Sequence, residues 1–120
     1  AGPAFAVYRD KLYIAYKSSN SNDLWYNVFD GASWLTQDLK ISQGGHSKTS
    51  ATPALAVFQD RLYLTYRSSN SDDVWYNVFD GTDWLQQDIK VTENGKVRTG
   101  RGPALATAPP YLVMVYRDAS

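Results

Sequence analysis

Two sets of aromatic side chains are the residues of this chain best suited to contact a ligand. Each set combines an adjacent Trp-Tyr pair with a second tryptophan, and the members are Trp25, Tyr26 and Trp34, then Trp75, Tyr76 and Trp84. Aromatic rings can cover the apolar C–H face of a sugar, while amide, hydroxyl and cationic groups nearby bond its hydroxyls. The pattern therefore predicts shallow sites in which aromatic surface and a few polar groups converge.

A polar segment precedes each aromatic pair and supplies hydrogen-bonding groups. Residues 17–23 read KSSNSND, and residues 67–73 read RSSNSDD. The candidate ligand contacts are one cation and one amide from each copy, namely Lys17 and Asn20, then Arg67 and Asn70. Two other interpretations remain open: Ser, Asn and Asp also close turns by bonding the backbone, and each tryptophan is also suited to packing between sheets.

Both sets belong to a repeat of about 50 residues. Residues 3–40 align with residues 53–90 without a gap, and residues 103–117 begin a third copy. A fixed period of this size is typical of stacked units that are incomplete on their own, such as solenoids and propellers. We therefore divide the chain into repeat 1 with its linker (1–52), repeat 2 with its linker (53–102) and a partial third repeat (103–120).

Each full repeat is predicted to contain four short strands, because apolar residues alternate with other residues at period two. In repeat 1 the strands are expected at about 4–9, 11–18, 23–30 and 33–40. The turn at Asp30-Gly31 is typical of a hairpin, since glycine readily adopts positive φ. Adjacent residues of a strand face opposite sides, so only one ring of each Trp-Tyr pair is expected to pack between sheets. The predicted fold class is all-β, with each repeat a four-stranded antiparallel meander.

A four-stranded sheet of this kind exposes two apolar faces, and stacking several around an axis buries both. The sequence therefore predicts β-propeller blades, with about 2.4 blades in the chain. Because a propeller needs roughly 4–8 blades, we expect several copies to complete a ring as a homo-oligomer, or the chain to be a segment of a longer propeller.

The repeat resembles the blades of bacterial and fungal β-propeller lectins, in particular short lectins whose chains carry two blades and trimerise. The similarity covers both full repeats and rests on residues 12–16, 24–26 and 29–34 and on the matching order at 62–66, 74–76 and 79–84. It implies a carbohydrate-binding protein with repeated weak glycan sites that act multivalently.

One departure from that family concerns the sugar. In the trimeric fucose-binding members, an arginine on the second strand and a glutamate on the third hold the sugar hydroxyls. The matching positions here are Ile14 or Leu64 and Tyr26 or Tyr76. Fucose recognition in that manner is therefore not expected.

The titratable residues argue against catalysis. The chain has no cysteine, a single histidine (His46) and a single glutamate (Glu93), and most aspartates lie at turns. A carboxylate pair for glycoside hydrolysis would have to come from residues such as Asp38 and Asp88, yet the repeats stay symmetric where a hydrolase usually departs from symmetry. We therefore expect no enzyme activity, no metal site and no cofactor.

Charge and hydropathy exclude two classes of partner. With 12 basic and 12 acidic residues, the chain has no basic surface suited to nucleic acid. No apolar run approaches the roughly 20 residues of a membrane helix. The expected partners are glycans, neutral sugars rather than acidic ones, and further copies of the chain. The lack of cysteine leaves the compartment open, and a secreted or cell-surface location is compatible with it.

A second function remains open from the sequence. High similarity between repeats and the lack of catalytic groups also fit a structural or protein-interaction propeller segment, including one engineered or excised from a longer protein. The chain begins with Ala1 rather than methionine, which we interpret as the start of a mature, trimmed or excised chain.

Overall fold

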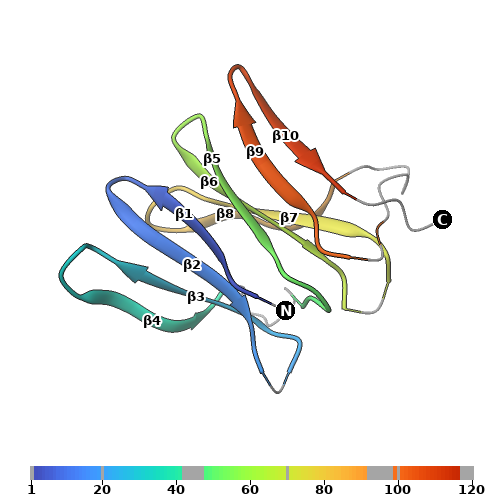
Figure 1. Ribbon diagram of the computed structural model, residues 1–120, viewed down its shortest axis with the longest axis horizontal. Helices are drawn as coiled ribbons and strands as arrows, with labels where there is room; N and C mark the ends of the chain where they lie inside the picture. The colour runs from blue at the N-terminus through green and yellow to red at the C-terminus, as the bar shows by residue number, and fades with distance from the viewer. Residues whose placement is uncertain are drawn as a thin grey trace.

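The computed structural model of the chain describes residues 2–19, 21–41, 48–69, 71–91, 99 and 101–116 (Figure 1). All regular structure in these residues is β-strand, and no helix occurs among them. Sheet 1 contains β1 (Ala4–Tyr8), β2 (Lys11–Lys17), β3 (Leu24–Phe29) and β4 (Trp34–Lys40). Sheet 2 contains β5 (Ala54–Phe58), β6 (Arg61–Arg67), β7 (Val74–Phe79) and β8 (Trp84–Lys90). The all-β prediction is confirmed.

The strands of each sheet are antiparallel and follow chain order. The partial third repeat forms a terminal hairpin of β9 (Ala104–Ala108) and β10 (Tyr111–Val115). Figure 1 shows the three units side by side in chain order, sheet 1, then sheet 2, then the terminal hairpin. Each sequence repeat thus forms one structural unit, and the units lie side by side in chain order.

Two kinds of turn join the strands of each sheet. Arg9 and Asp10 connect β1 to β2 with φ angles of 50° and 62°, as in the two-residue turns that match the twist of paired strands. Between β3 and β4, Asp30 Oδ1 accepts hydrogen bonds from the backbone N–H groups of Ala32 (2.8 Å) and Ser33 (2.9 Å). Bonds from these N–H groups lower the pKa of Asp30, because they favour the ionised carboxylate. Both turns recur in sheet 2.

Each unit has two faces, which we name by their residues. The forward face carries Ala6, Tyr13 and Ala15 in sheet 1, with equivalents Ala56, Tyr63 and Thr65 in sheet 2 and Ala106, Val113 and Val115 in the terminal hairpin. The rear face carries Phe5, Leu12 and Ile14 in sheet 1, with equivalents Leu55, Leu62 and Leu64, then Leu105, Leu112 and Met114. The alternation follows from the strand period of two.

The core lies where the forward face of sheet 1 packs on the rear face of sheet 2. One cluster joins Tyr8, Tyr13 and Val28 to Leu62 and Phe79 of sheet 2. Its rings meet edge to face, with centroids 5.6 Å apart for Tyr8 and Tyr13 and 5.8 Å apart for Tyr13 and Phe79, a geometry that aromatic pairs favour. Burial of these large side chains is therefore the main term that holds the two sheets together.

The backbones of neighbouring units come closest at their first strands, β1 against β5 and β5 against β9. At the start of β9 the approach is so close that a Cβ atom on Gly102 would clash with the carbonyl oxygen of Thr52. Polar contacts add to the packing at the first junction. The Tyr8 hydroxyl donates to the carbonyl oxygen of Asp60 (2.8 Å), and the guanidinium of Arg9 pairs with the carboxylate of the same residue (2.9 Å).

The turn after β3 gives a test of backbone conformation alone. Gly31 has a φ of 102°, and a Cβ atom there would meet nothing within 4 Å. Replacing it by alanine should destabilise the protein by about 1–2 kcal/mol, because L-residues disfavour positive φ. Gly2→Ala is the control, since Gly2 also has open space around it but no such φ. Equal thermal unfolding midpoints for the two variants would contradict this account of the turn.

Candidate functional site

A groove of about 470 Å³ opens between the two full repeats. The residues of sheet 1 and its C-terminal end that line it are Tyr26, Leu39, Lys40 and Ile41. The residues of sheet 2 that line it are Thr82, Asp83 and Trp84, which follow the Asp80-Gly81 turn. The site therefore exists only where the forward face of one sheet meets the outer strands of the next.

Two aromatic rings form one wall of the groove. The Tyr26 and Trp84 rings lie 5.8 Å apart at 82°, and Trp84 also packs on Phe79 at 4.9 Å. Nε1 of Trp84 is buried and has no hydrogen-bond acceptor among the described residues. Burial raises the pKa of the Tyr26 hydroxyl, and the nearby Trp84 indole acts in the opposite direction. The phenol stays protonated at neutral pH and is able to donate or accept a hydrogen bond.

Polar groups border the aromatic wall. The carboxylate of Asp80 holds this turn by accepting hydrogen bonds from the backbone N–H groups of Thr82 and Asp83, both at 2.8 Å. The turn thus uses main-chain donors of Thr82 and Asp83, and both residues line the groove. Lys40 is a lining residue, but its ammonium group lies 3.6 Å from Asp23 and 5.5 Å above the Trp25 ring, on the rear face of sheet 1. The groove therefore combines the aromatic surface of Tyr26 and Trp84 with the Tyr26 hydroxyl and the polar residues Thr82 and Asp83.

The structure brings only two of the predicted site residues together in this groove, Tyr26 from repeat 1 and Trp84 from repeat 2. Trp34, the counterpart of Trp84, is exposed on the rear face of sheet 1, where it packs against Phe29 at 4.9 Å. Tyr76, the counterpart of Tyr26, lines a smaller cavity of about 220 Å³ against the terminal hairpin. Each therefore forms half of an arrangement that is complete only at the junction of sheets 1 and 2.

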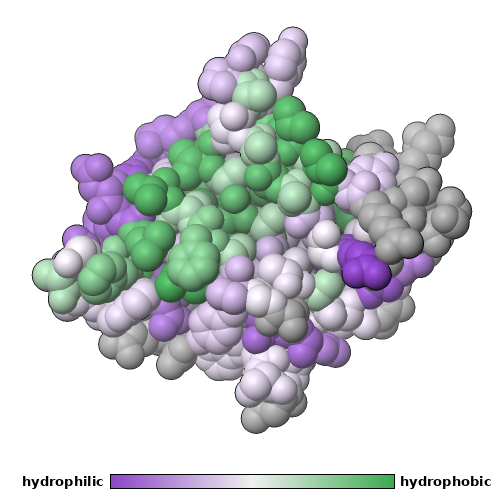
Figure 2. Space-filling view, in the orientation of Figure 1, coloured by the Kyte–Doolittle hydropathy of each residue, from purple (hydrophilic) through white to green (hydrophobic). Residues whose placement is uncertain are grey.

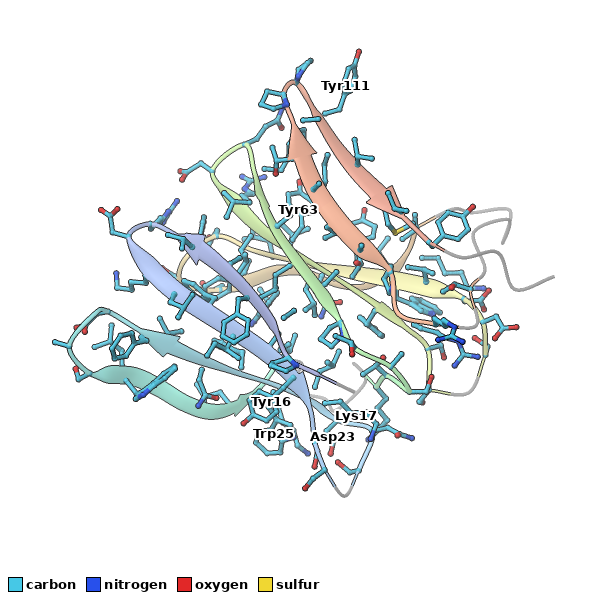
Figure 3. All side chains as sticks on the ribbon, in the orientation of Figure 1. Tyr16, Lys17, Asp23, Trp25, Tyr63 and Tyr111 are labelled. Atoms are coloured by element: carbon cyan, nitrogen blue, oxygen red, sulfur yellow. The ribbon has the colours of Figure 1, made fainter. Side chains whose placement is uncertain are left out.

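The remaining tryptophans lie on rear faces near the loop after the second strand. Trp25 lines a shallow hollow of about 230 Å³ with Tyr16, Ser18 and Ser19, and Figure 3 shows Trp25 beside Tyr16 at one end of sheet 1. Trp75 occupies the same position in sheet 2, where it packs partly between the sheets. Of these two rings, the one in sheet 1 therefore lies in the more open setting.

The two predicted cations close loops. Lys17 Nζ donates to the carbonyl oxygens of Ser18 (3.2 Å) and Ser21 (2.9 Å). Arg67 Nε donates to the carbonyl oxygen of Thr99 at 2.7 Å. The same guanidinium donates to the Ser50 hydroxyl and pairs with the Asp72 carboxylate. Through these contacts Lys17 and Arg67 stabilise the loops that follow the second strand of each sheet.

Several predicted residues lie outside the described part of the chain. These are Asn20, Asn70, His46 and Glu93. The roles given to the two asparagines stay predictions. Among the residues that the structure does describe, no group of three or more His, Cys, Asp or Glu side chains could hold a metal ion.

The sequence did not single out most of the groove. Leu39, Lys40, Ile41, Thr82 and Asp83 were not among the candidates, yet they line it beside Tyr26 and Trp84. The position of Thr82 and Asp83 directly after an Asp-Gly turn was a usable signal. Which residues of sheet 1 they would face depends on packing between sheets, and strand periodicity carries no such information.

Comparison with known proteins found no matching family model, no matching curated protein and no matching solved structure. Among the described residues, no helix has the length and hydrophobicity to span a lipid bilayer.

An ion pair beside the groove links the linker to sheet 1. The carboxylate of Asp23 accepts hydrogen bonds from Lys48 Nζ at 2.6 Å and from the Ser21 hydroxyl at 3.1 Å. The bond from Lys48 is the main reason why the pKa of Asp23 lies below its ordinary value, and Lys40 adds a smaller effect. The same carboxylate thus pairs with Lys48 of the linker and with Lys40 of β4.

Removal of the Lys48 charge should raise the pKa of Asp23 towards the ordinary value of about 3.9. We expect this in Lys48→Met, measured by NMR titration, with a smaller rise in the control Lys40→Met. A lowered folded-state pKa gives stability that is present above the unfolded-state pKa and lost as pH falls through the folded value. Acid unfolding of Lys48→Met should therefore depend less on pH below about pH 4. An unchanged Asp23 titration in this variant would contradict the assignment.

Proposed function

We propose that the chain is a lectin-like carbohydrate-binding module, in which the repeats act as β-propeller blades and a glycan binds between consecutive blades. The observation that carries the proposal is the groove in which Tyr26 and Trp84 meet Thr82 and Asp83. Its volume of about 470 Å³ lies within the usual range of small-molecule sites, about 300–1,000 Å³.

The lining of the groove matches the two surfaces of a sugar. The rings of Tyr26 and Trp84 and the exposed side chain of Leu39 offer apolar surface to the C–H face. The Tyr26 hydroxyl and the polar residues Thr82 and Asp83 offer acceptors and donors to the sugar hydroxyls. The acidic residue Asp83 in this lining disfavours an acidic sugar, so the proposed ligand is a neutral one.

The arrangement of the sheets supports the propeller part of the proposal. Neighbouring units come closest at their first strands, as expected of blades arranged around a shared axis. The forward face of each unit packs on the rear face of the next. A ring completed by several copies of the chain follows as the expected assembly.

Only one complete groove is present in the described part of each chain under this proposal. The terminal hairpin has no counterparts of β7 and β8, so Tyr76 lies in a cavity with the apolar side chains of Leu105, Leu112 and Met114. In an assembly that carries several such grooves, weak sites would gain strength because later contacts are intramolecular.

A non-catalytic structural or protein-interaction segment is the second candidate. The internal hydrogen bonds of Lys17 and Arg67 favour it, because they occupy polar groups that the sequence assigned to ligand contact. Such a protein would leave Tyr26 and Trp84 as packing residues without affinity for glycans. The binding experiment below separates the two candidates.

Binding should be measured on a glycan array and then by titration of tryptophan fluorescence. We expect Trp84→Ala to weaken binding by about tenfold or more, which corresponds to a loss of about 1.4 kcal/mol. Trp34→Ala is the matched control, because Trp34 has the same place in its repeat but lies on an open face. Its affinity per site should stay unchanged.

A second variant guards against a loss of fold, since Trp84 also packs on Phe79. Asp83→Ala removes a groove carboxylate but keeps the backbone N–H that holds the turn. It should reduce affinity while its circular dichroism spectrum remains that of the unmodified chain. If the unmodified protein binds no glycan at millimolar concentration, the carbohydrate-binding proposal is wrong.

A further inference from the structure

One wall of the groove belongs to a turn whose position depends on the neighbouring sheet. Thr82, Asp83 and Trp84 of sheet 2 line the groove together with Tyr26 of sheet 1. The Asp80 carboxylate fixes the conformation of the turn through two main-chain hydrogen bonds, but both bonds lie within the turn. The distance between this turn and sheet 1, which sets the width of the groove, therefore depends on contacts across the junction.

Arg9, in the turn between β1 and β2, makes such a contact. A Cβ atom placed on Gly81 would lie 2.5 Å from Nη1 and 3.2 Å from Cζ of Arg9, so the guanidinium fills the space that a side chain at position 81 would need. Figure 1 shows the turn between β7 and β8 beside the turn between β1 and β2. A Cβ atom on Gly31, the counterpart of Gly81, would meet nothing within 4 Å. The contact with Arg9 thus belongs to the turn that forms the groove wall.

Charge holds the guanidinium in this place. Arg9 Nη2 donates to Asp60 Oδ2 at 2.9 Å and Arg9 Nε donates to Asp60 Oδ1 at 3.4 Å, so the pair has the two-pronged form that fixes an arginine in one orientation. The bond to Asp60 is the main reason why the pKa of Arg9 lies above its ordinary value, and the charge of Asp80 contributes. The guanidinium also lies 5.2 Å from the centre of the Tyr8 ring. Arg9 therefore joins its own turn to the turns at Asp60 and at Gly81.

This link is open to solvent. The side chains of Arg9 and Asp60 are 46% and 76% exposed. Figure 2 shows hydrophilic residues gathered over the ends of the β1–β2 and β5–β6 hairpins, where these turns lie in Figure 1. Dissolved ions screen exposed charges efficiently. The strength of the link, and with it the position of the groove wall, therefore changes with salt concentration.

We propose that Arg9 is a positioning residue for the groove, so that glycan affinity falls as salt concentration rises even for a sugar that carries no charge. Arg9 does not line the groove and acts on it only through the turn at Gly81. The effect on affinity rests on the proposed function, whereas the positioning is a property of the chain without ligand. A neutral sugar in a groove of fixed width would bind with little dependence on salt, because it offers no charge to screen.

Arg9→Gln removes the charge and keeps the backbone, because Gln59 holds the equivalent place in sheet 2 with the same φ of 50°. At about 0.01 M sodium chloride this variant should bind a neutral glycan about threefold more weakly than the unmodified chain, in keeping with the modest strength of an exposed ion pair. The difference should vanish at about 1 M, where screening acts within about 3 Å. The control Lys11→Gln removes a cation of the same hairpin that forms no ion pair with any described residue. It should keep the affinity and the salt dependence of the unmodified chain.

Two glycines give a matched test of the contact itself. Gly81→Ala and Gly31→Ala add the same methyl group at φ angles of 106° and 102°, so the backbone strain is alike. Only Gly81→Ala displaces the guanidinium of Arg9. It should weaken glycan binding by about the same factor as Arg9→Gln and abolish the salt dependence, whereas Gly31→Ala should change neither. Adding Arg9→Gln to Gly81→Ala should cause no further loss, because both substitutions act on one contact.

A measurement without sugar tests the positioning alone. The rings of Tyr26 and Trp84 lie 5.8 Å apart at 82°, so NMR cross-relaxation between their protons reports on the groove wall. The intensities should change in Arg9→Gln and in Gly81→Ala and stay the same in Lys11→Gln. Circular dichroism checks that each variant keeps the fold of the unmodified chain.

Unchanged contacts between the Tyr26 and Trp84 rings in Arg9→Gln would overturn the positioning role, whether or not the chain binds glycans. Equal salt dependence of glycan affinity in the unmodified chain and in Arg9→Gln would overturn it as well. A chain that binds no glycan but shows the altered ring contacts disproves the proposed function and supports the positioning role. The two proposals therefore fail by different observations.

Discussion

Burial of two apolar faces per sheet is the constraint on which the rest of this structure depends. A β-strand places alternate residues on opposite sides, and here both sides of sheet 2 carry hydrophobic residues. One side is covered by Tyr8, Tyr13 and Val28 of sheet 1 and the other by the terminal hairpin. Sheet 2 is thus the best buried unit. The groove at its outer strands forms because the forward face of sheet 1 packs on its rear face.

The sequence predicts the local structure well because its signals are local. Alternation of apolar residues identifies the strands, and Asp30-Gly31 identifies a turn in which glycine has a φ of 102°. Alternation also indicates that neighbouring Trp25 and Tyr26 face opposite sides, as the structure has it. These features depend on residues a few positions apart, so they can be read without knowledge of the partner sheet.

The site could be predicted only in part, because it depends on contacts between repeats. Tyr26 meets Trp84, nearly 60 positions along the chain, rather than Trp34 of its own repeat. Near-identical repeats offer both tryptophans equally, and only the order of stacking decides between them. The loop cations illustrate the same limit, since the bond from Arg67 to Thr99 depends on the path of a linker between repeats.

The uniformity of the junctions has a consequence for growth. A contact between two different faces of the same unit can repeat from one unit to the next without limit. The angle between successive units then decides whether a closed ring or an open filament forms. In the proposed ring, an angle between units that divides a full turn evenly would give a closed assembly of finite size. A change in that angle, for example at the close contact of Gly102 with Thr52, would instead give an open filament.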